Sequence, residues 1–151
     1  MFRGTTNVTI DDKGRVVVPS QHRAELIAPA SGRVIVTVDQ DKCLLVYPLP
    51  EWDRVEAQLM AAPTLNNPRA LAVQELLTGR AQELVVDAHG RLSLTPELRK
   101  YAKLERAACF VGMRNRLALW DEQRWNAHIE TSIKTEQTAT TPAEGLAGLS
   151  L

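Results

Sequence analysis

Two segments of the chain share the pattern Asp-x-x-Gly-Arg, and their arginines are well suited to bind a ligand. The first segment is Asp11–Arg15 and the second is Asp87–Arg91. An arginine guanidinium is a planar fork of N–H donors that matches phosphate oxygens or the O6/N7 edge of guanine. The aspartate can hydrogen-bond the backbone two residues on, and the glycine tolerates a positive φ. We therefore predict four loop-shaping residues: Asp11, Gly14, Asp87 and Gly90.

The arginines of these motifs have two interpretations. In the first, each motif is only a tight hairpin in which the arginine folds back onto its own aspartate. In the second, the arginine binds a ligand. After Arg91, Leu92 and Leu94 alternate with Ser93, which places Arg91 on the solvent side of a strand. Arg15 has the same position in the first motif, and this recurrence favours the binding interpretation.

The two motifs belong to a tandem duplication. Residues 8–18 match residues 84–94 at a constant offset of 76. Residues 44–52 match residues 117–125 at an offset of 73, so the second copy is three residues shorter between its two matches. Two matches in the same order indicate that the chain contains two copies of one module.

Each copy has the pattern of two strands, a short helix and two further strands. Val8 and Ile10 alternate with polar residues, as in a half-buried strand. Thr95 suits a helix N-cap with Pro96 at the first helical position, and Pro19 occupies a similar place in the first copy. The second strand pair is joined by the polar turn 39–42 in one copy and by residues 114–116 in the other.

Helical patterns lie between and after the copies. One spans Glu51 to Ala62, and a second begins at Asn67. A last helix begins at Asp121, and periodicity fades from about Thr131. We predict a first repeat at 5–52, a helical connector at 53–80, a second repeat at 81–130 and a flexible tail at 131–151.

A single four-strand module is too small to bury an adequate core, since a module of about forty residues rarely folds alone. Two modules can merge their apolar faces and close a small barrel, which removes exposed strand edges. The predicted fold class is therefore α+β, mainly β: a small barrel formed from two tandem ββαββ repeats, with intervening and C-terminal helices.

The composition is that of a globular protein with no overall charge. Hydrophobic residues make up 44% of the chain, and 18 Lys and Arg balance 18 Asp and Glu. Residues 1–24 and 87–106 each carry a local net charge of +2, so a basic face can exist on a neutral chain. The sequence has no apolar leader and no run of the roughly 18 apolar residues that span a membrane. We expect a soluble, cytoplasmic protein without a membrane partner.

Other residues of potential chemical use have simpler interpretations. Cys43 and Cys109 lie among apolar residues, so we predict buried thiols. The three histidines lack the spacing of a metal site and are interpreted as solvated surface: His22, His89 and His128. The repeated aromatic residues are interpreted as core: Tyr47, Trp52, Trp120 and Trp125. We predict no catalytic residue, no metal and no cofactor, and hence no enzyme.

The chain resembles the MraZ family from Met1 to about residue 130. The paired motifs, the opening Met1–Gly4 and the stretch Leu44–Trp52 carry this resemblance. It implies the AbrB-like (SpoVT-AbrB) swapped-hairpin fold. It also implies a repressor-like, nucleoid-associated regulator that binds repeats of double-stranded DNA in the promoter of the division and cell-wall gene cluster. The family's self-association implies a ring-like homo-oligomer.

The resemblance also assigns DNA contact to the motif arginines, here Arg15 and Arg91. Lys13 in the first loop corresponds to His89 in the second, so we expect the first loop to bind more strongly. Three further arginines are weaker candidates for DNA contact: Arg23 and Arg99, which share the offset of 76, and Arg3.

Several barrels on one assembly would raise affinity through effective concentration. The helices between Trp52 and Leu77 are the candidate subunit contacts. The alternative function is an antitoxin-like protein-interaction module, which would co-purify with a toxic partner and show no salt-sensitive DNA binding.

Overall fold

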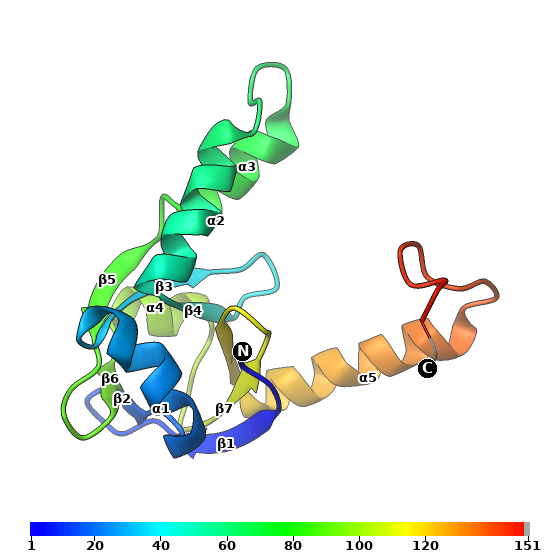
Figure 1. The fold of residues 1–151 in the computed structure, drawn as a ribbon. Coiled ribbons are helices and arrows are strands. Elements are labelled where there is room, and N and C mark those ends of the chain that lie inside the picture. Colours follow the sequence, from blue (N-terminus) through cyan, green and yellow to red (C-terminus); the bar gives the residue numbers. More distant parts are fainter. Residues whose placement is uncertain (150–151) are drawn as a thin grey trace.

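The computed structural model describes residues 1–149, which form a six-stranded antiparallel sheet, a two-stranded ribbon and five α-helices (Figure 1). The first half contains β1 (Thr5–Thr9), β2 (Arg15–Val17), α1 (Ser20–Ile27), a 3₁₀ turn (Ala28–Ala30), β3 (Arg33–Val38) and β4 (Leu44–Pro48). The second half contains β5 (Gln82–Val85), β6 (Arg91–Ser93), α4 (Pro96–Tyr101), β7 (Ala107–Gly112) and β8 (Leu117–Asp121). Helices α2 (Leu49–Ala61) and α3 (Pro68–Leu77) lie between the halves, and α5 (Glu122–Thr138) follows the second. The order of elements is the one that the repeat predicts.

Each half contributes strands to the other half. The sheet has the order β1-β7-β8-β4-β3-β5, so β1 of the first half pairs with β7 of the second, and β5 of the second pairs with β3 of the first. Strands β2 and β6 pair with each other in the separate ribbon. Neither half therefore contains the strand partners of its own first hairpin.

The β2–β6 ribbon lies on an approximate twofold axis. Val16 pairs with Leu92 at its centre, and both side chains are fully buried. On either side, the amide of Leu94 donates to the carbonyl of Gly14 at 2.9 Å, and the amide of Val18 donates to that of Gly90 at 2.8 Å. These two hydrogen bonds are equivalent under the offset of 76 residues. The duplication in sequence is thus a pseudo-symmetry in space.

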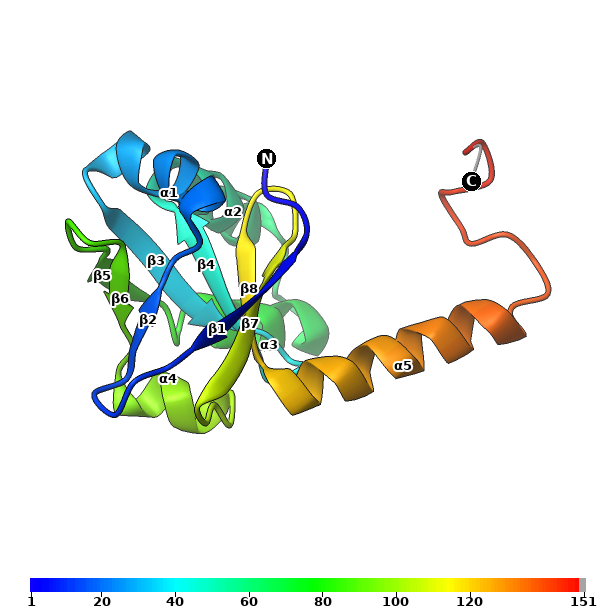
Figure 2. The same cartoon turned by 90° about the horizontal axis from the view of Figure 1, so that it is seen from below.

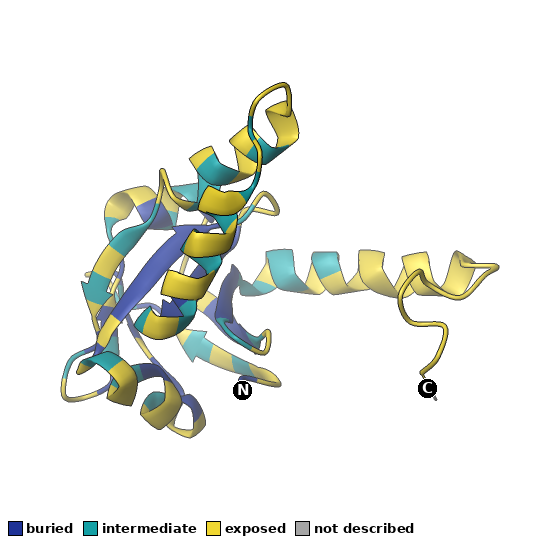
Figure 3. Cartoon of the chain, turned by 45° about the horizontal axis from the view of Figure 1, so that its top comes forward, coloured by how far each residue is buried: buried dark blue, intermediate teal, exposed yellow. Residues whose placement is uncertain are grey.

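Buried residues concentrate on the strands of the sheet (Figure 3). They form two hydrophobic clusters, one on each face of the sheet. The larger cluster includes Val16 and Leu92 of the ribbon and one buried leucine from each of α1 and α4, Leu26 and Leu98. The smaller cluster, on the opposite face, contains the predicted aromatic core residues and thiols: Tyr47, Trp52, Trp120, Cys43 and Cys109. All five are buried, as predicted, and Trp125 is partly buried against them. Alternation along β4 separates the clusters, since Leu44 and Val46 belong to one and Leu45 and Tyr47 to the other.

Three helices extend away from the sheet. Helices α2 and α3 form one projecting arm, and α5 projects in a different direction (Figures 1 and 2). Trp52 is the buried residue of α2, whereas α3 and α5 bury none of their described side chains. Helix α5 continues to Thr138, so the first residues of the expected tail are helical. Among the described helices, none is long and apolar enough to cross a membrane.

Candidate nucleic-acid interface

The first Asp-x-x-Gly-Arg segment forms a loop that its aspartate organises. One carboxylate oxygen, Oδ1 of Asp11, accepts hydrogen bonds from the backbone amides of Lys13 and Arg15, both at 2.9 Å. The amide of Gly14 donates to the carbonyl of Asp11 at 2.9 Å, and Gly14 has a φ of +79°. The backbone and side-chain hydrogen bonds from Arg15 lower the pKa of Asp11. The aspartate and the glycine therefore have the geometry that the motif predicts.

The second loop repeats this arrangement. Oδ1 of Asp87 accepts from the amide of His89 at 2.8 Å and from the amide of Arg91 at 2.9 Å, and Gly90 has a φ of +78°. The pKa of Asp87 is lowered to about 2, mainly by the hydrogen bond from the backbone amide of Arg91. Hydrogen bonds from the Arg91 side chain and the His89 amide lower it further. The carboxylate therefore stays ionised across the neutral and mildly acidic range.

Both motif arginines contact their own aspartates through one nitrogen only. Nε of Arg15 donates to Oδ2 of Asp11 at 2.7 Å, and Nε of Arg91 donates to Oδ2 of Asp87 at 2.8 Å. The two arginine side chains remain 36% and 39% exposed. Within residues 1–149 the Nη groups of both arginines make no hydrogen bond to protein, so four N–H donors per guanidinium are free. The ion pair orients each fork without using up its binding capacity.

Arg15 and Arg91 lie on the same outer face of the ribbon. In the ribbon, Arg15 lies opposite Ser93, and Arg91 lies opposite Val17. The central pair, Val16 and Leu92, faces the core. Ser93 and Val17 are exposed, so no element within residues 1–149 covers this face. The two arginines are diagonal neighbours, a relation that places Cα atoms about 7–8 Å apart. They can therefore act together on one ligand surface.

Arg23 and Arg99 pack against the glycines of the opposite half. A Cβ atom on Gly14 would lie 2.7 Å from Nε of Arg99, and one on Gly90 would lie 2.5 Å from Nε of Arg23. Nε of Arg23 also donates to the carbonyl of Val18 at 2.8 Å. Each loop is thus braced by a helix-borne arginine from the other half, a role that sequence spacing alone does not indicate.

The remaining predicted binding residues lie in different places. Lys13 and His89 are exposed at the tips of the two loops. Arg3 lines a hollow beside the β7–β8 turn with Met113 and Arg114, at the opposite end of β1 from the first loop. The structure therefore gathers Lys13 with the motif arginines and separates Arg3 from them.

The prediction that the histidines are solvated is wrong for His22. His22 is only 6% exposed and lies edge-on to Phe2 with ring centroids 5.5 Å apart. Burial lowers the pKa of its imidazole. The offset of 76 aligns His22 with buried Leu98, a signal that could have revealed its position. His128 is also partly buried, with its ring 4.5 Å from that of Trp120.

Metal and thiol chemistry have no evident site here. In the described part of the chain, no three His, Cys, Asp or Glu side chains group as metal ligands. Burial raises the pKa of the Cys43 thiol to about 12 and that of Cys109 to about 11. Both thiols are therefore protonated and unreactive at neutral pH.

The close packing on Gly14 can be tested against a glycine with the same backbone conformation. Gly4 has a φ of +81°, but a Cβ there would meet nothing within 4 Å. Gly4→Ala should cost about 1–2 kcal/mol of unfolding free energy through the positive φ alone. Gly14→Ala should cost clearly more because the new methyl group displaces Arg99. Urea denaturation measures both, and equal losses would contradict the packing described here.

The lowered pKa of Asp87 makes stability depend on acid. Because the folded-state pKa of about 2 lies below the unfolded value of about 3.9, the ionised carboxylate stabilises the fold above about pH 4. That contribution should be lost as the pH falls towards 2. Urea midpoints between pH 5 and pH 2 should fall less for Asp87→Asn than for the wild type. As a control, Asp53→Asn changes an exposed residue on α2 and should keep the wild-type pH dependence. If the Asp87 carboxyl of the folded wild-type protein titrates near pH 4, the lowered pKa is wrong.

Comparison with known proteins places the chain in a family. The family model described as "MraZ protein, putative antitoxin-like" matches residues 1–74 and 77–145. The "Transcriptional regulator MraZ" of Thioalkalivibrio sulfidiphilus is 42% identical over 151 residues, covering all of both chains. Those of Pseudomonas aeruginosa (strain LESB58) and Salmonella typhi are 46% and 44% identical, covering 88% and 100% of both chains, respectively. The chain therefore belongs to the MraZ family.

Proposed function

We propose that this protein is a sequence-specific, repressor-like DNA-binding transcriptional regulator that presents the β2–β6 ribbon to the major groove. The observation that carries the proposal is that Arg15 and Arg91 lie on one exposed ribbon face with free Nη donors. The major groove, about 12 Å wide, admits a two-stranded ribbon, and arginine can bind the O6/N7 edge of guanine. The relatives named "Transcriptional regulator MraZ" support the same role.

The two loops would flank the ribbon on the DNA. Asp11 and Asp87 fix the loop backbones, and Lys13 adds a flexible cation at the tip of the first. His89 has the equivalent place in the second loop. The exchange of β1 and β5 between halves supports an AbrB-like swapped-hairpin barrel, in which both loops belong to one rigid unit. The proposed targets are promoter repeats of the division and cell-wall gene cluster, bound in the cytoplasm at the nucleoid.

Self-association into a ring-like homo-oligomer is part of the proposal. Leu71 and Val73 of α3 are each 44% exposed, and no residue of α3 is buried. An isolated helix of about ten residues is marginal in water, so its stability needs tertiary contacts. A second copy of the chain would cover the apolar surface of the arm. Joining several barrels would multiply affinity for repeated DNA elements by about 10²–10⁴.

The antitoxin-like alternative predicts a different ligand for the same ribbon face. It has support from the printed description of the family. A protein partner would bind without a strong dependence on salt, whereas DNA affinity falls steeply with salt because bound counterions are released. Titration of the purified chain with its own promoter DNA at several salt concentrations therefore separates the two functions.

Arg15→Ala should weaken DNA binding without unfolding the protein. We expect about a 5- to 150-fold loss of affinity for the cognate element, since a bidentate arginine–guanine contact is worth about 1–3 kcal/mol. Fluorescence anisotropy with cognate and scrambled duplexes measures the loss, and the melting temperature should stay close to wild type because the Asp11 pair is solvent-exposed. Lys134→Ala on α5 removes an exposed cation far from the ribbon and should leave affinity unchanged. Unchanged affinity in Arg15→Ala would refute the assignment.

The arm can be tested through the mass of the assembly. The double variant Leu71→Glu, Val73→Glu should lower the oligomer mass seen by light scattering, because it places charge on the proposed contact surface. Ile133→Glu on α5 is a matched control, since Ile133 is also 44% exposed on a projecting helix. The control should keep the wild-type mass. A double variant of wild-type mass would show that subunits meet elsewhere.

A further inference from the structure

The two ends of the ribbon are equivalent in fold. At one end the Asp11–Arg15 loop lies against α4, because Arg99 packs over Gly14. At the other end the Asp87–Arg91 loop lies against α1, because Arg23 packs over Gly90. We call residues 10–15 and 96–106 the α4 end, and residues 86–91 and 20–30 the α1 end. The offset of 76 relates every position of one end to a position of the other.

The two ends differ strongly in charge. The α4 end carries six cationic and four anionic side chains, whereas the α1 end carries two of each. Four substitutions between the copies add cations at the α4 end, and one of them is Arg106 in place of Ala30. Its Lys100 and Lys103 correspond to Ala24 and Ile27, and its Lys13 corresponds to His89. The pseudo-symmetric unit therefore has one basic end and one neutral end.

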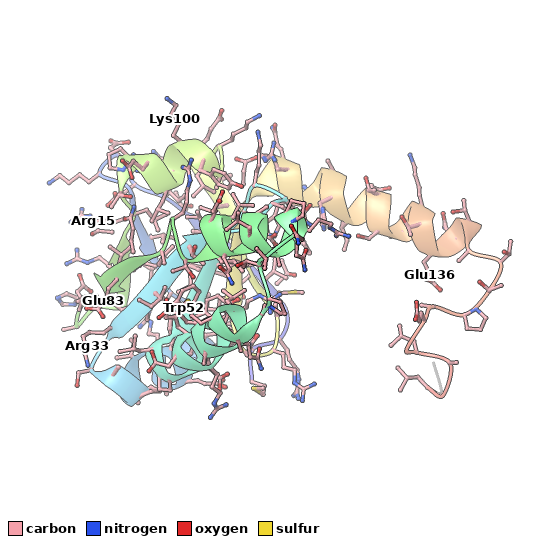
Figure 4. All side chains as sticks on the ribbon, turned by 90° about the horizontal axis from the view of Figure 1, so that it is seen from above. Arg15, Arg33, Trp52, Glu83, Lys100 and Glu136 are labelled. Atoms are coloured by element: carbon pink, nitrogen blue, oxygen red, sulfur yellow. The ribbon has the colours of Figure 1, made fainter. Side chains whose placement is uncertain are left out.

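Three of the four additional cations, the lysines, are available to a ligand, whereas Arg106 pairs with Asp12. Lys13, Lys100 and Lys103 are exposed, and within residues 1–149 none of them forms an ion pair. In Figure 4, Lys100 on α4 and Arg15 lie on the same part of the molecule, on the opposite side from Glu136 of α5. At the α1 end, in contrast, the amino group of Met1 pairs with Glu25.

A cleft extends the basic surface beside α4. It has a volume of about 710 Å³. Glu97 is the one carboxylate in its lining, whereas four lining side chains are cationic: Lys42, Arg80, Lys100 and Lys103. Near α1, Phe2 is 1% exposed and packs on His22, and a separate hollow of about 670 Å³ is lined there by Arg3 and Arg114. The cleft beside α4 adds Lys42 and Arg80 to the cations of the α4 end.

We propose that the α4 end is a phosphate-binding flank, in which Lys100 and Lys103 contact the DNA backbone beside the groove that the ribbon enters. This inference rests on the proposed DNA-binding function and adds an orientation to it. Phosphate contacts fix the register and direction of a protein on a duplex, whereas base contacts read the sequence. The protein therefore binds its element in one direction, with the α4 end always on the same flank.

A footprint of the full-length protein tests this orientation. The DNA is an element selected by the wild-type protein from a pool of random duplexes, cleaved with hydroxyl radicals. The wild type should protect more phosphates on one flank than on the other. Lys100→Ala, Lys103→Ala should lose that one-sided protection, while the preferred bases stay the same. The slope of log affinity against log salt should fall in magnitude by about 2, at about 0.9 for each lost phosphate contact.

Two matched variants sharpen the test. Lys134→Ala removes an exposed cation from α5 and should leave footprint and slope unchanged. Lys100→Ala, Ala24→Lys moves one charge between equivalent exposed positions at constant net charge. It should reduce protection on the original flank and increase it on the other.

The outcomes separate this inference from the function on which it rests. A symmetric wild-type footprint, or an unchanged salt slope in Lys100→Ala, Lys103→Ala, overturns the inference alone, provided that Arg15→Ala still weakens binding to the cognate element. If the wild type selects no DNA element, the proposed function fails and the inference fails with it.

Discussion

The pairing of β2 with β6 is the contact on which the rest of the structure depends. The ribbon is only three residues long on each side, and such a short pair is marginal by itself. It persists because Val16 and Leu92 are fully buried in the main cluster and because β1 and β5 are built into the opposite halves of the sheet. Separating the two strands would expose that cluster. It would also remove the two arginines from their common face.

The aspartate of each loop joins folding to the proposed binding. One carboxylate oxygen is used by two backbone amides, which shape the loop, and the other is used by the arginine Nε, which orients the guanidinium. The Nη groups are left for a ligand. The two interpretations of the motif, a self-contained hairpin and a binding site, are therefore compatible. The fold-back contact prepares the arginine for binding by restricting its side-chain rotamers, which reduces the entropy lost when a ligand binds.

Local features of the fold could be predicted from the sequence, whereas contacts between the halves could not. The positive φ of Gly14, the Thr95 cap and the burial of Trp52 follow from nearby residues or from periodicity. Helix α2 begins at Leu49 rather than Glu51 because Pro50 is tolerated in a first turn. Strand exchange and the packing of Arg99 on Gly14 depend on which half supplies each partner. A repeat pattern contains no such information, because both choices of partner have the same sequence signature.

Duplication within one chain has a consequence that a dimer of identical modules would not have. The two copies can diverge, so a symmetric frame can carry different surfaces at equivalent positions. Helices α2 and α5 follow β4 and β8 at the offset of 73, yet α2 continues into an arm with α3 while α5 extends alone. The divergence that makes one ribbon end basic and the divergence of the two helical extensions thus have the same origin, because each copy could change without a matching change in the other.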